Sequence, residues 1–195
     1  MAVEGERTEV DYFNYIKDTL ADARITLHIL AEPNGMNRST SSASWSTRMT
    51  RRGTLGGVRP RSARRHTGGL QDRANRNGVN VAFCHPSFDL WLLLHFQSFS
   101  GAQSGSTVVV REQLNQYPGF EGFGAHDKRL DARRVAALRG NEASAIRQGR
   151  KLAEDCPTTS CVSGPEHAEH CDPLNRDPSA DVWRLLEALG IPVSE

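Results

Sequence analysis

Residues 51–69, RRGTLGGVRPRSARRHTGG, constrain the fold most, because they offer almost nothing to a hydrophobic core. This run holds six arginines, five glycines and no carboxylate. The wider segment 33–71 contains eight arginines and no Asp or Glu, although the whole chain has a formal charge of only +1. Apolar periodicity is absent across it, which predicts a disordered basic insert much longer than the usual connection inside a compact domain. The rest of the chain must therefore supply the core.

The 195 residues are enough for one domain with a core of its own. No run of apolar residues approaches the length of a membrane span, and the opening MAVEGERTEV lacks the basic and apolar regions of a signal peptide. We therefore expect a cytoplasmic protein without a membrane partner. In that compartment the four cysteines are not expected to form a disulfide framework.

The remaining chain alternates between strand-like and helix-like segments. Strands are expected at 24–30 and 79–84, and helices at 9–22, 88–96, 111–117, 132–154 and 179–190. Thr8 and Asp11 resemble a capping box for the first helix, Ser87 is the expected N-cap of the second, and Ser179 that of the last. Gly140 weakens the prediction of one continuous helix over 132–154. This alternation indicates an α/β layer structure.

Four motifs occur in an order that resembles RloB-like proteins. They are VEGERTEVDYF at the start, NGVNVAFCHPSFDLWLLLHF in the middle, HDKRLD at 126–131 and DPSADVWRLLEALG near the end. His85 and Asp89 stand where the family usually has Asn and Glu. The resemblance implies a Toprim-like fold, with a small parallel sheet flanked by helices. It also implies a phage-defence role in abortive infection or restriction loci, as a nuclease acting on nucleic acid with a partner ATPase encoded nearby.

The resemblance further implies a Mg²⁺ site built from acids that follow two strands. One carboxylate follows the first strand and an Asp-x-Asp pair follows a later one, and carboxylate oxygens are suitable ligands for this ion. Bound Mg²⁺ would stabilise charge on a phosphate oxygen or activate water. Glu4 matches the first acid, and is therefore a candidate catalytic and metal-binding residue. The Asp-x-Asp strand should fall where the basic segment lies, so we expect one central strand to be lost and this copy to be impaired.

A shift of reading frame over about residues 37–73 would explain both the basic segment and the missing acids. Codons can be written for residues 53–62 such that a shift of one base yields V-R-W-V-V-F-D-R-D, which restores the Asp-x-Asp motif. An excess of Arg and Gly without acids is typical of a shifted G+C-rich gene. The alternative is a genuine basic insert.

The other candidate catalytic residues are Asp89 and Lys128. Asp89 and His85 lie where a strand leads into a helix, the kind of edge where α/β folds place their sites. Asp127 and Lys128 match a Tyr-Asp-Lys motif of the family, in which a lysine would neutralise charge developing on a phosphate. A solvated loop pair is the alternative for Asp127 and Lys128.

Glu6 and Glu9 are possible supporting residues of the metal site. The alternative is that they are exposed acids favoured in the first turn of a helix by its dipole. His95 lies further along the apolar helix and is expected to be a core histidine.

Residues 156–178 form a Cys/His-rich loop whose spacing fits no standard zinc site. Its candidate zinc ligands are Cys156, Cys161, His167, His170 and Cys171. An inserted loop without metal is the favoured interpretation.

These expectations combine into one domain over 1–155, interrupted by the irregular segment 37–73. The loop 156–178 then leads to a C-terminal helix over 179–190 that belongs to the same domain. The alternative to an impaired nuclease is a non-catalytic interaction or nucleic-acid-binding component of a defence system.

Overall fold

The structure is a computed structural model that describes residues 2–3, 7–19, 30–31, 55–58, 80–103, 106–124, 127–154 and 176–191. Strands and helices alternate along these residues, as the sequence predicts. The fold class, a mixed α/β arrangement, is therefore confirmed. None of the helices in the described part of the chain is long and apolar enough to span a bilayer.

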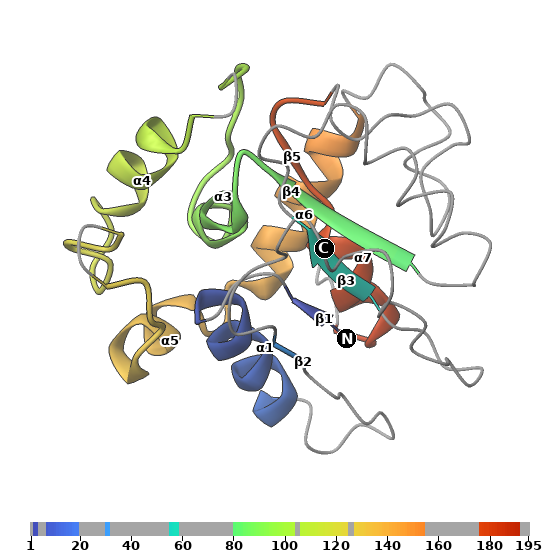
Figure 1. Cartoon of the computed structure of the whole chain (residues 1–195), viewed down its shortest axis with the longest axis horizontal. Helices are drawn as coiled ribbons and strands as arrows, with labels where there is room; N and C mark the ends of the chain where they lie inside the picture. Colours follow the sequence, from blue (N-terminus) through green and yellow to red (C-terminus); the bar gives the residue numbers. More distant parts are fainter. Residues whose placement is uncertain are drawn as a thin grey trace, which may run out of the picture.

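Five strands of the described residues join in one sheet with the order β2-β1-β3-β4-β5. Their bounds are Ala2–Val3 (β1), Leu30–Ala31 (β2), Leu55–Val58 (β3), Asn80–His85 (β4) and Ser179–Ala180 (β5). The pairings among β1 to β4 are parallel, with Val3 opposite Gly57 and Val58 opposite Phe83. β5 runs antiparallel to β4. Figure 1 shows β3 and β4 as the longest arrows of this sheet.

The expected loss of a central strand is wrong. Leu55–Val58, inside the basic segment, forms β3 between β1 and β4. Two glycines make this strand intrinsically weak. Pairing with a strand on each side gives its backbone groups hydrogen-bond partners, which outweighs the weak local preference.

Strand β4 leads directly into a buried helix, α3, at Phe88–Leu93. Ser87 caps this helix as expected, because its hydroxyl accepts a hydrogen bond from the Asp89 backbone N–H at 3.3 Å. All six residues of α3 are buried, and all of them except Asp89 are apolar. In Figure 1, α3 is seen nearly end-on between α4 (Val108–Leu114) and α6 (Glu142–Glu154). The apolar block of the sequence therefore forms the centre of the core.

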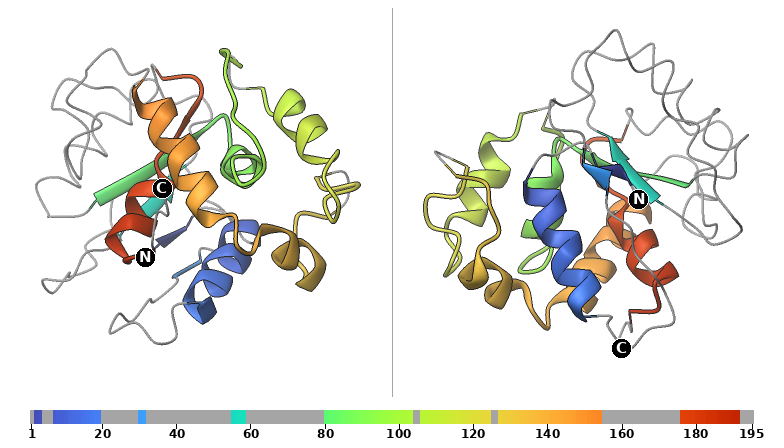
Figure 2. Two further views of the ribbon diagram at one scale, coloured as in Figure 1. Left: turned by 180° about the vertical axis from the view of Figure 1, so that it is seen from behind. Right: turned by 60° about the horizontal axis from the view of Figure 1, so that its bottom comes forward.

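Helices α6 and α7 (Val182–Ala188) lie together behind the strands in Figure 1 and in front of them in the reverse view of Figure 2. Gly149 allows this close packing, since a Cβ there would lie 2.9 Å from Cδ1 of Trp183. The prediction that Ser179 is the N-cap of α7 is wrong. Ser179 lies in β5, and Asp181 precedes the helix instead.

The expected helix over 132–154 is two helices, α5 (Ala132–Leu138) and α6. Gly140 lies between them with a φ of +85°, a conformation that favours glycine. Helix α4 begins at Val108, three residues before the expected start at 111.

Helix α1 (Thr8–Thr19) packs its aromatic face against α3, with Tyr12 fully buried. His95 is a core histidine, as expected, and is only 1% exposed. Its Nδ1 lies 3.0 Å from the Trp91 carbonyl and its Nε2 lies 3.3 Å from the Tyr12 hydroxyl. A neutral ring satisfies both contacts, with Nδ1–H donating to the carbonyl and Nε2 accepting from Tyr12. Burial lowers the pKa of His95 to about 4.

This lowered pKa predicts a loss of stability in acid. The unfolded chain binds the proton near the ordinary pKa of 6.5, whereas the folded chain resists it until about 4. The free energy of unfolding should therefore fall by about 3 kcal/mol as the pH drops through this window. Urea unfolding at several pH values should show a shallower dependence for His95→Gln than for the wild type. Parallel curves would contradict this role of His95.

Candidate functional site

The candidate site is centred on the Asp89 carboxylate in the first turn of α3. Ser87 begins this helix directly after the turn that follows β4, which places Asp89 at the end of the strand. Asp89 is fully buried, and its side chain is only 1% exposed. A carboxylate buried in this way is stable only with charged or hydrogen-bonding partners. Two cations from distant parts of the chain provide them.

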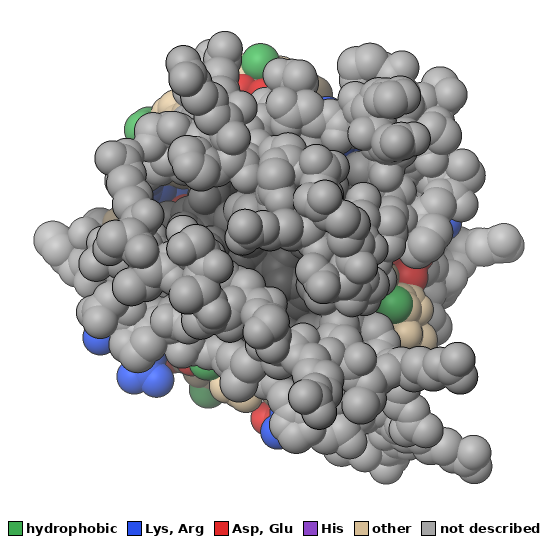
Figure 3. All heavy atoms as spheres, turned by 45° about the vertical axis from the view of Figure 1, so that its right-hand side comes forward, with side chains coloured by type: hydrophobic (Ala, Val, Ile, Leu, Met, Phe, Trp, Pro, Cys, Tyr) green, Lys and Arg blue, Asp and Glu red, His purple; other side chains and the backbone are tan. Residues whose placement is uncertain are grey.

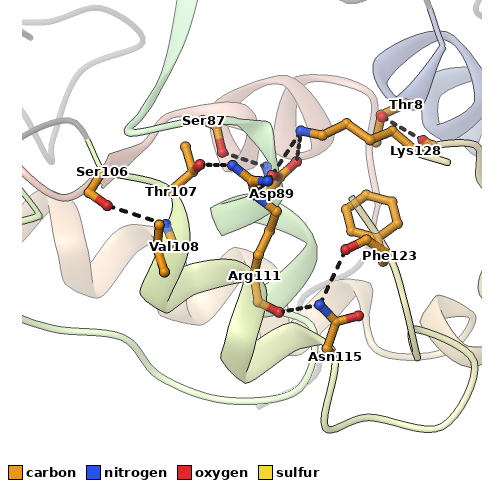
Figure 4. A network of polar contacts seen from close by, with 10 residues as sticks. All are labelled: Thr8, Ser87, Asp89, Ser106, Thr107, Val108, Arg111, Asn115, Phe123 and Lys128. Atoms are coloured by element: carbon orange, nitrogen blue, oxygen red, sulfur yellow. Dashed lines mark hydrogen bonds and ion pairs between the residues drawn. The ribbon is translucent and has the colours of Figure 1, made fainter. Parts of the chain in front are cut away.

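Lys128 is the first of these cations. Its Nζ donates to both carboxylate oxygens of Asp89, at 3.0 and 3.3 Å. The sequence predicts both residues as catalytic candidates, and the structure brings them together across 39 positions of the chain. Figure 4 shows the lysine reaching the carboxylate from the loop beside α1.

The loop that carries Lys128 is anchored to the start of α1. The Thr8 hydroxyl donates to the Lys128 carbonyl at 2.6 Å, and the Leu130 N–H donates to Oδ2 of Asp11 at 3.0 Å. The capping-box interpretation of Thr8 and Asp11 is therefore wrong. Both side chains bind the loop instead, so the opening motif of the sequence positions Lys128.

Arg111, on α4, is the second cation and was not predicted as a site residue. Its Nε lies 3.5 Å from Oδ2 of Asp89, and its Nη2 donates to the Thr107 hydroxyl. Gly124 makes room for the arginine stem, because a Cβ at Gly124 would lie 2.6 Å from Cδ of Arg111. The sequence offered one signal for this residue. If the helix is taken to start at 108 rather than at 111, Arg111 lies one helical turn after Thr107 and on the same side of the helix.

Asp89, Lys128 and Arg111 together carry a net charge of +1. One cation is enough to neutralise a buried carboxylate, so the second leaves a surplus of positive charge. The side chains of Lys128 and Arg111 are both 32% exposed, whereas Asp89 is closed to solvent. The site therefore presents an orientated pair of cations to solvent, an arrangement suited to phosphate or another anion.

Asp127 points into the supporting loop rather than toward Asp89. The Arg129 N–H donates to its Oδ1 at 2.9 Å, and Arg134 donates to its Oδ2 at 3.1 Å. These hydrogen bonds hold the pKa of Asp127 below its ordinary value. Arg134 also donates to the Arg129 carbonyl at 2.5 Å, which closes the loop. Asp127 thus stabilises the segment from which Lys128 extends.

His85, at the end of β4, lies 3.7 Å from Oδ2 of Asp177 through its Nε2. The same Asp177 oxygen accepts a hydrogen bond from the Gln103 backbone N–H at 2.9 Å. Within the described residues, no hydrogen bond or ion pair joins His85 to Asp89. The structure therefore places these two predicted residues in separate contacts.

The predicted acids of the opening motif are only partly described. Glu4 and Glu6 lie outside the described residues. Glu9 is 6% exposed, so its interpretation as an exposed first-turn acid is wrong. In sequence, Glu4 follows β1 and Arg59 follows β3, the two strands that pair at Val3 and Gly57. Carboxyl ends of neighbouring parallel strands meet at one edge of a sheet, which is where α/β folds bind ligands.

The described residues at this edge do not by themselves provide a Mg²⁺ site. The described residues contain no group of three His, Cys, Asp or Glu side chains that could hold a metal ion. Both oxygens of Asp89 already accept from Lys128. The sequence after β3 reads Arg59-Pro60-Arg61, which supplies no carboxylate. The five candidate zinc ligands of the Cys/His-rich loop lie outside the described residues.

These features define a class, an α/β protein with a cation pair held by a buried acid after a parallel strand. The sequence profile of the RloB-like protein family matches residues 60–189, two thirds of the chain. The chain belongs to the RloB-like protein family. The matched range contains Asp89, Arg111 and Lys128, whereas Glu4 precedes it. Comparisons with curated proteins and with solved structures gave no match.

The contact between Thr8 and the Lys128 carbonyl predicts a specific cost of substitution. Thr8→Val keeps the shape of the side chain but removes the donor, and should lower the free energy of unfolding by about 1–2 kcal/mol. Thr8→Ser retains the hydroxyl and should cost clearly less. Urea unfolding of the three proteins measures the difference. Equal losses for valine and serine would show that the hydrogen bond contributes little.

Proposed function

We propose that this chain is an RloB-like phage-defence protein, derived from a Mg²⁺-dependent nuclease and impaired as a catalyst. The observation that carries the proposal is the pair of cations on Asp89, at the end of a strand of the parallel part of the sheet. Such a pair suits the phosphodiester of a nucleic acid, and Lys128 would neutralise charge on the phosphate as it develops. A partner ATPase encoded nearby and an abortive-infection role are further parts of this proposal.

Strand β3 supports the idea that the chain once carried an Asp-x-Asp pair. The strand ends at Val58, between β1 and β4. In the shifted frame, residues 55–58 would read W-V-V-F, which suits a buried strand better than L-G-G-V. The same frame places Asp-Arg-Asp at positions 59–61, directly after the strand. In that frame, strand and acids would fall at the positions that the metal site implied by the family resemblance requires.

The impairment follows from the charges that replace those acids. Positions 59 and 61 carry arginines instead of carboxylates, so the ligands on which a metal-dependent step would depend are missing from the sequence. Arginine cannot be deprotonated in a protein and cannot serve as a ligand for Mg²⁺. Positive charge at these positions would also repel the ion.

A second function, nucleic-acid binding without cleavage, is favoured by the surplus positive charge of the Asp89 site. The eight arginines of segment 33–71 add to this charge. Phosphate neutralisation by Lys and Arg is sufficient for binding that does not depend on sequence. Nuclease assays on the natural and restored chains separate the two functions.

The natural chain should not cleave nucleic acid, whereas a restored chain should regain Mg²⁺-dependent cleavage. In the restored chain, residues 53–61 read V-R-W-V-V-F-D-R-D, which includes Arg59→Asp and Arg61→Asp. The assay follows plasmid DNA and single-stranded RNA with Mg²⁺ and with EDTA. A rate at least 100-fold above that of the natural chain is expected, because two missing ligands are supplied.

The matched control carries the same strand with Arg59→Asn and Arg61→Asn, which removes the arginines without supplying carboxylates. It should remain inactive. Robust, EDTA-sensitive cleavage by the natural chain would refute the proposed impairment. A restored chain that folds but stays inactive on both substrates would refute the nuclease ancestry.

A further inference from the structure

We propose that Arg111 and Lys128, held by Asp89, bind one phosphate group of a nucleic-acid backbone, and that Arg111 is the residue that fixes its orientation. The proposal rests on the proposed function only in naming the source of the phosphate. It adds a binding residue from α4 that no motif indicates. It also requires no metal ion.

The position of Arg111 is fixed from three sides. The Asp89 carboxylate lies 3.5 Å from its Nε, the Thr107 hydroxyl accepts from its Nη2, and Gly124 lies against its stem. In Figure 4 the guanidinium lies between Thr107 and Asp89, with the Lys128 ammonium on the other side of the carboxylate. A guanidinium held in this way loses little further freedom when it binds a ligand.

The two cations have donors left for a ligand. The Lys128 ammonium has three N–H groups, and its hydrogen bonds within the described residues go to the two oxygens of Asp89. The hydrogen bond of Arg111 to a described side chain uses Nη2. Its Nη1 therefore has no acceptor among the described residues. The Arg111 Nε and the Lys128 Nζ lie 3.5 and 3.0 Å from the same Asp89 oxygen, Oδ2, and each side chain is one-third exposed. In the proposed site, donors on both cations bind the oxygens of one tetrahedral anion.

A purely structural role would not need both cations. One lysine that donates to both oxygens is enough to compensate a buried carboxylate. The contact of Arg111 with Asp89 is longer, at 3.5 Å, and therefore weaker than that of Lys128. Packing the arginine stem against Gly124 also costs conformational freedom. The surplus charge favours an anion as the third partner. The backbone phosphate fits because a guanidinium binds two of its oxygens side by side.

Exposed ion pairs elsewhere provide a matched control. Arg133 lies 3.1 Å from Glu121, with side chains 69% and 55% exposed, so its pairing contributes little. Acidic and basic side chains of described residues also lie near one another along the lower edge of the molecule in Figure 3. Arg133→Gln therefore removes one positive charge away from the site and leaves the Asp89 contacts unchanged.

The experiment measures binding of a fluorescein-labelled twelve-nucleotide single strand by anisotropy, with EDTA present throughout. DNA and RNA strands of the same sequence form two arms. Arg111→Gln and Lys128→Met should each weaken binding about tenfold in at least one arm, and should reduce the slope of log affinity against log salt by about 0.7. Arg133→Gln should change affinity by less than about twofold. Because the basic segment 33–71 is identical in all variants, its own contribution cancels.

Arg111→Lys keeps the charge and removes the planar guanidinium. It should bind several times more weakly than the natural chain, because a point charge cannot replace the paired donors. Circular dichroism and thermal unfolding of each variant confirm that it is folded. Losses at Arg111 and Lys128 no greater than at Arg133, in both arms, would overturn the site. Since EDTA excludes metal chemistry, a failure of the nuclease assay leaves this result unaffected.

Discussion

The buried carboxylate of Asp89 is the interaction on which the rest of the site depends. Its position in the first turn of α3 follows from Ser87 and the buried helix, so the core places a negative charge where water cannot solvate it. Such a charge costs several kcal/mol unless cations compensate it. Lys128 compensates this charge and Arg111 adds a second contact, and the two ion pairs tie the loop before α5 and α4 to α3. Thr8 extends this coupling to α1.

Sequence patterns predicted well where the determining interactions are local. The strand, turn and helix of NVAFCHPSFDLWLL follow from short-range hydrophobicity and from the Ser87 cap, and Gly140 marks a true helix break. Asp89 and Lys128 were both predicted as site residues. Their direct contact could not be predicted, because it joins positions 39 residues apart. For the same reason the partners of Thr8 and Asp11, in the loop near Lys128, were missed.

Strand β3 shows that a strand can form where the local sequence does not favour one. Its sequence L-G-G-V has almost no intrinsic strand preference, and propensity alone predicts a loop. Its place in the sheet is set by β1 and β4, whose edges would otherwise leave a row of backbone groups without partners. The neighbours specify that a strand lies there, but they do not specify the residues that follow it. A strand at this position is therefore no sign that the acids expected after it are present.

Under the proposed function, binding and catalysis would depend on different parts of this chain. The cation pair depends on Asp89, Thr8 and Gly124, all within the described residues and none within segment 33–71. The proposed metal site would depend on the residues after β3, where the sequence carries arginines. With acids at positions 59 and 61, this edge of the sheet could bind a metal ion through the acids and a phosphate through the cation pair. On the same proposal, the arginines at these positions would attract phosphate and repel the metal ion, which favours a protein that holds nucleic acid without cleaving it.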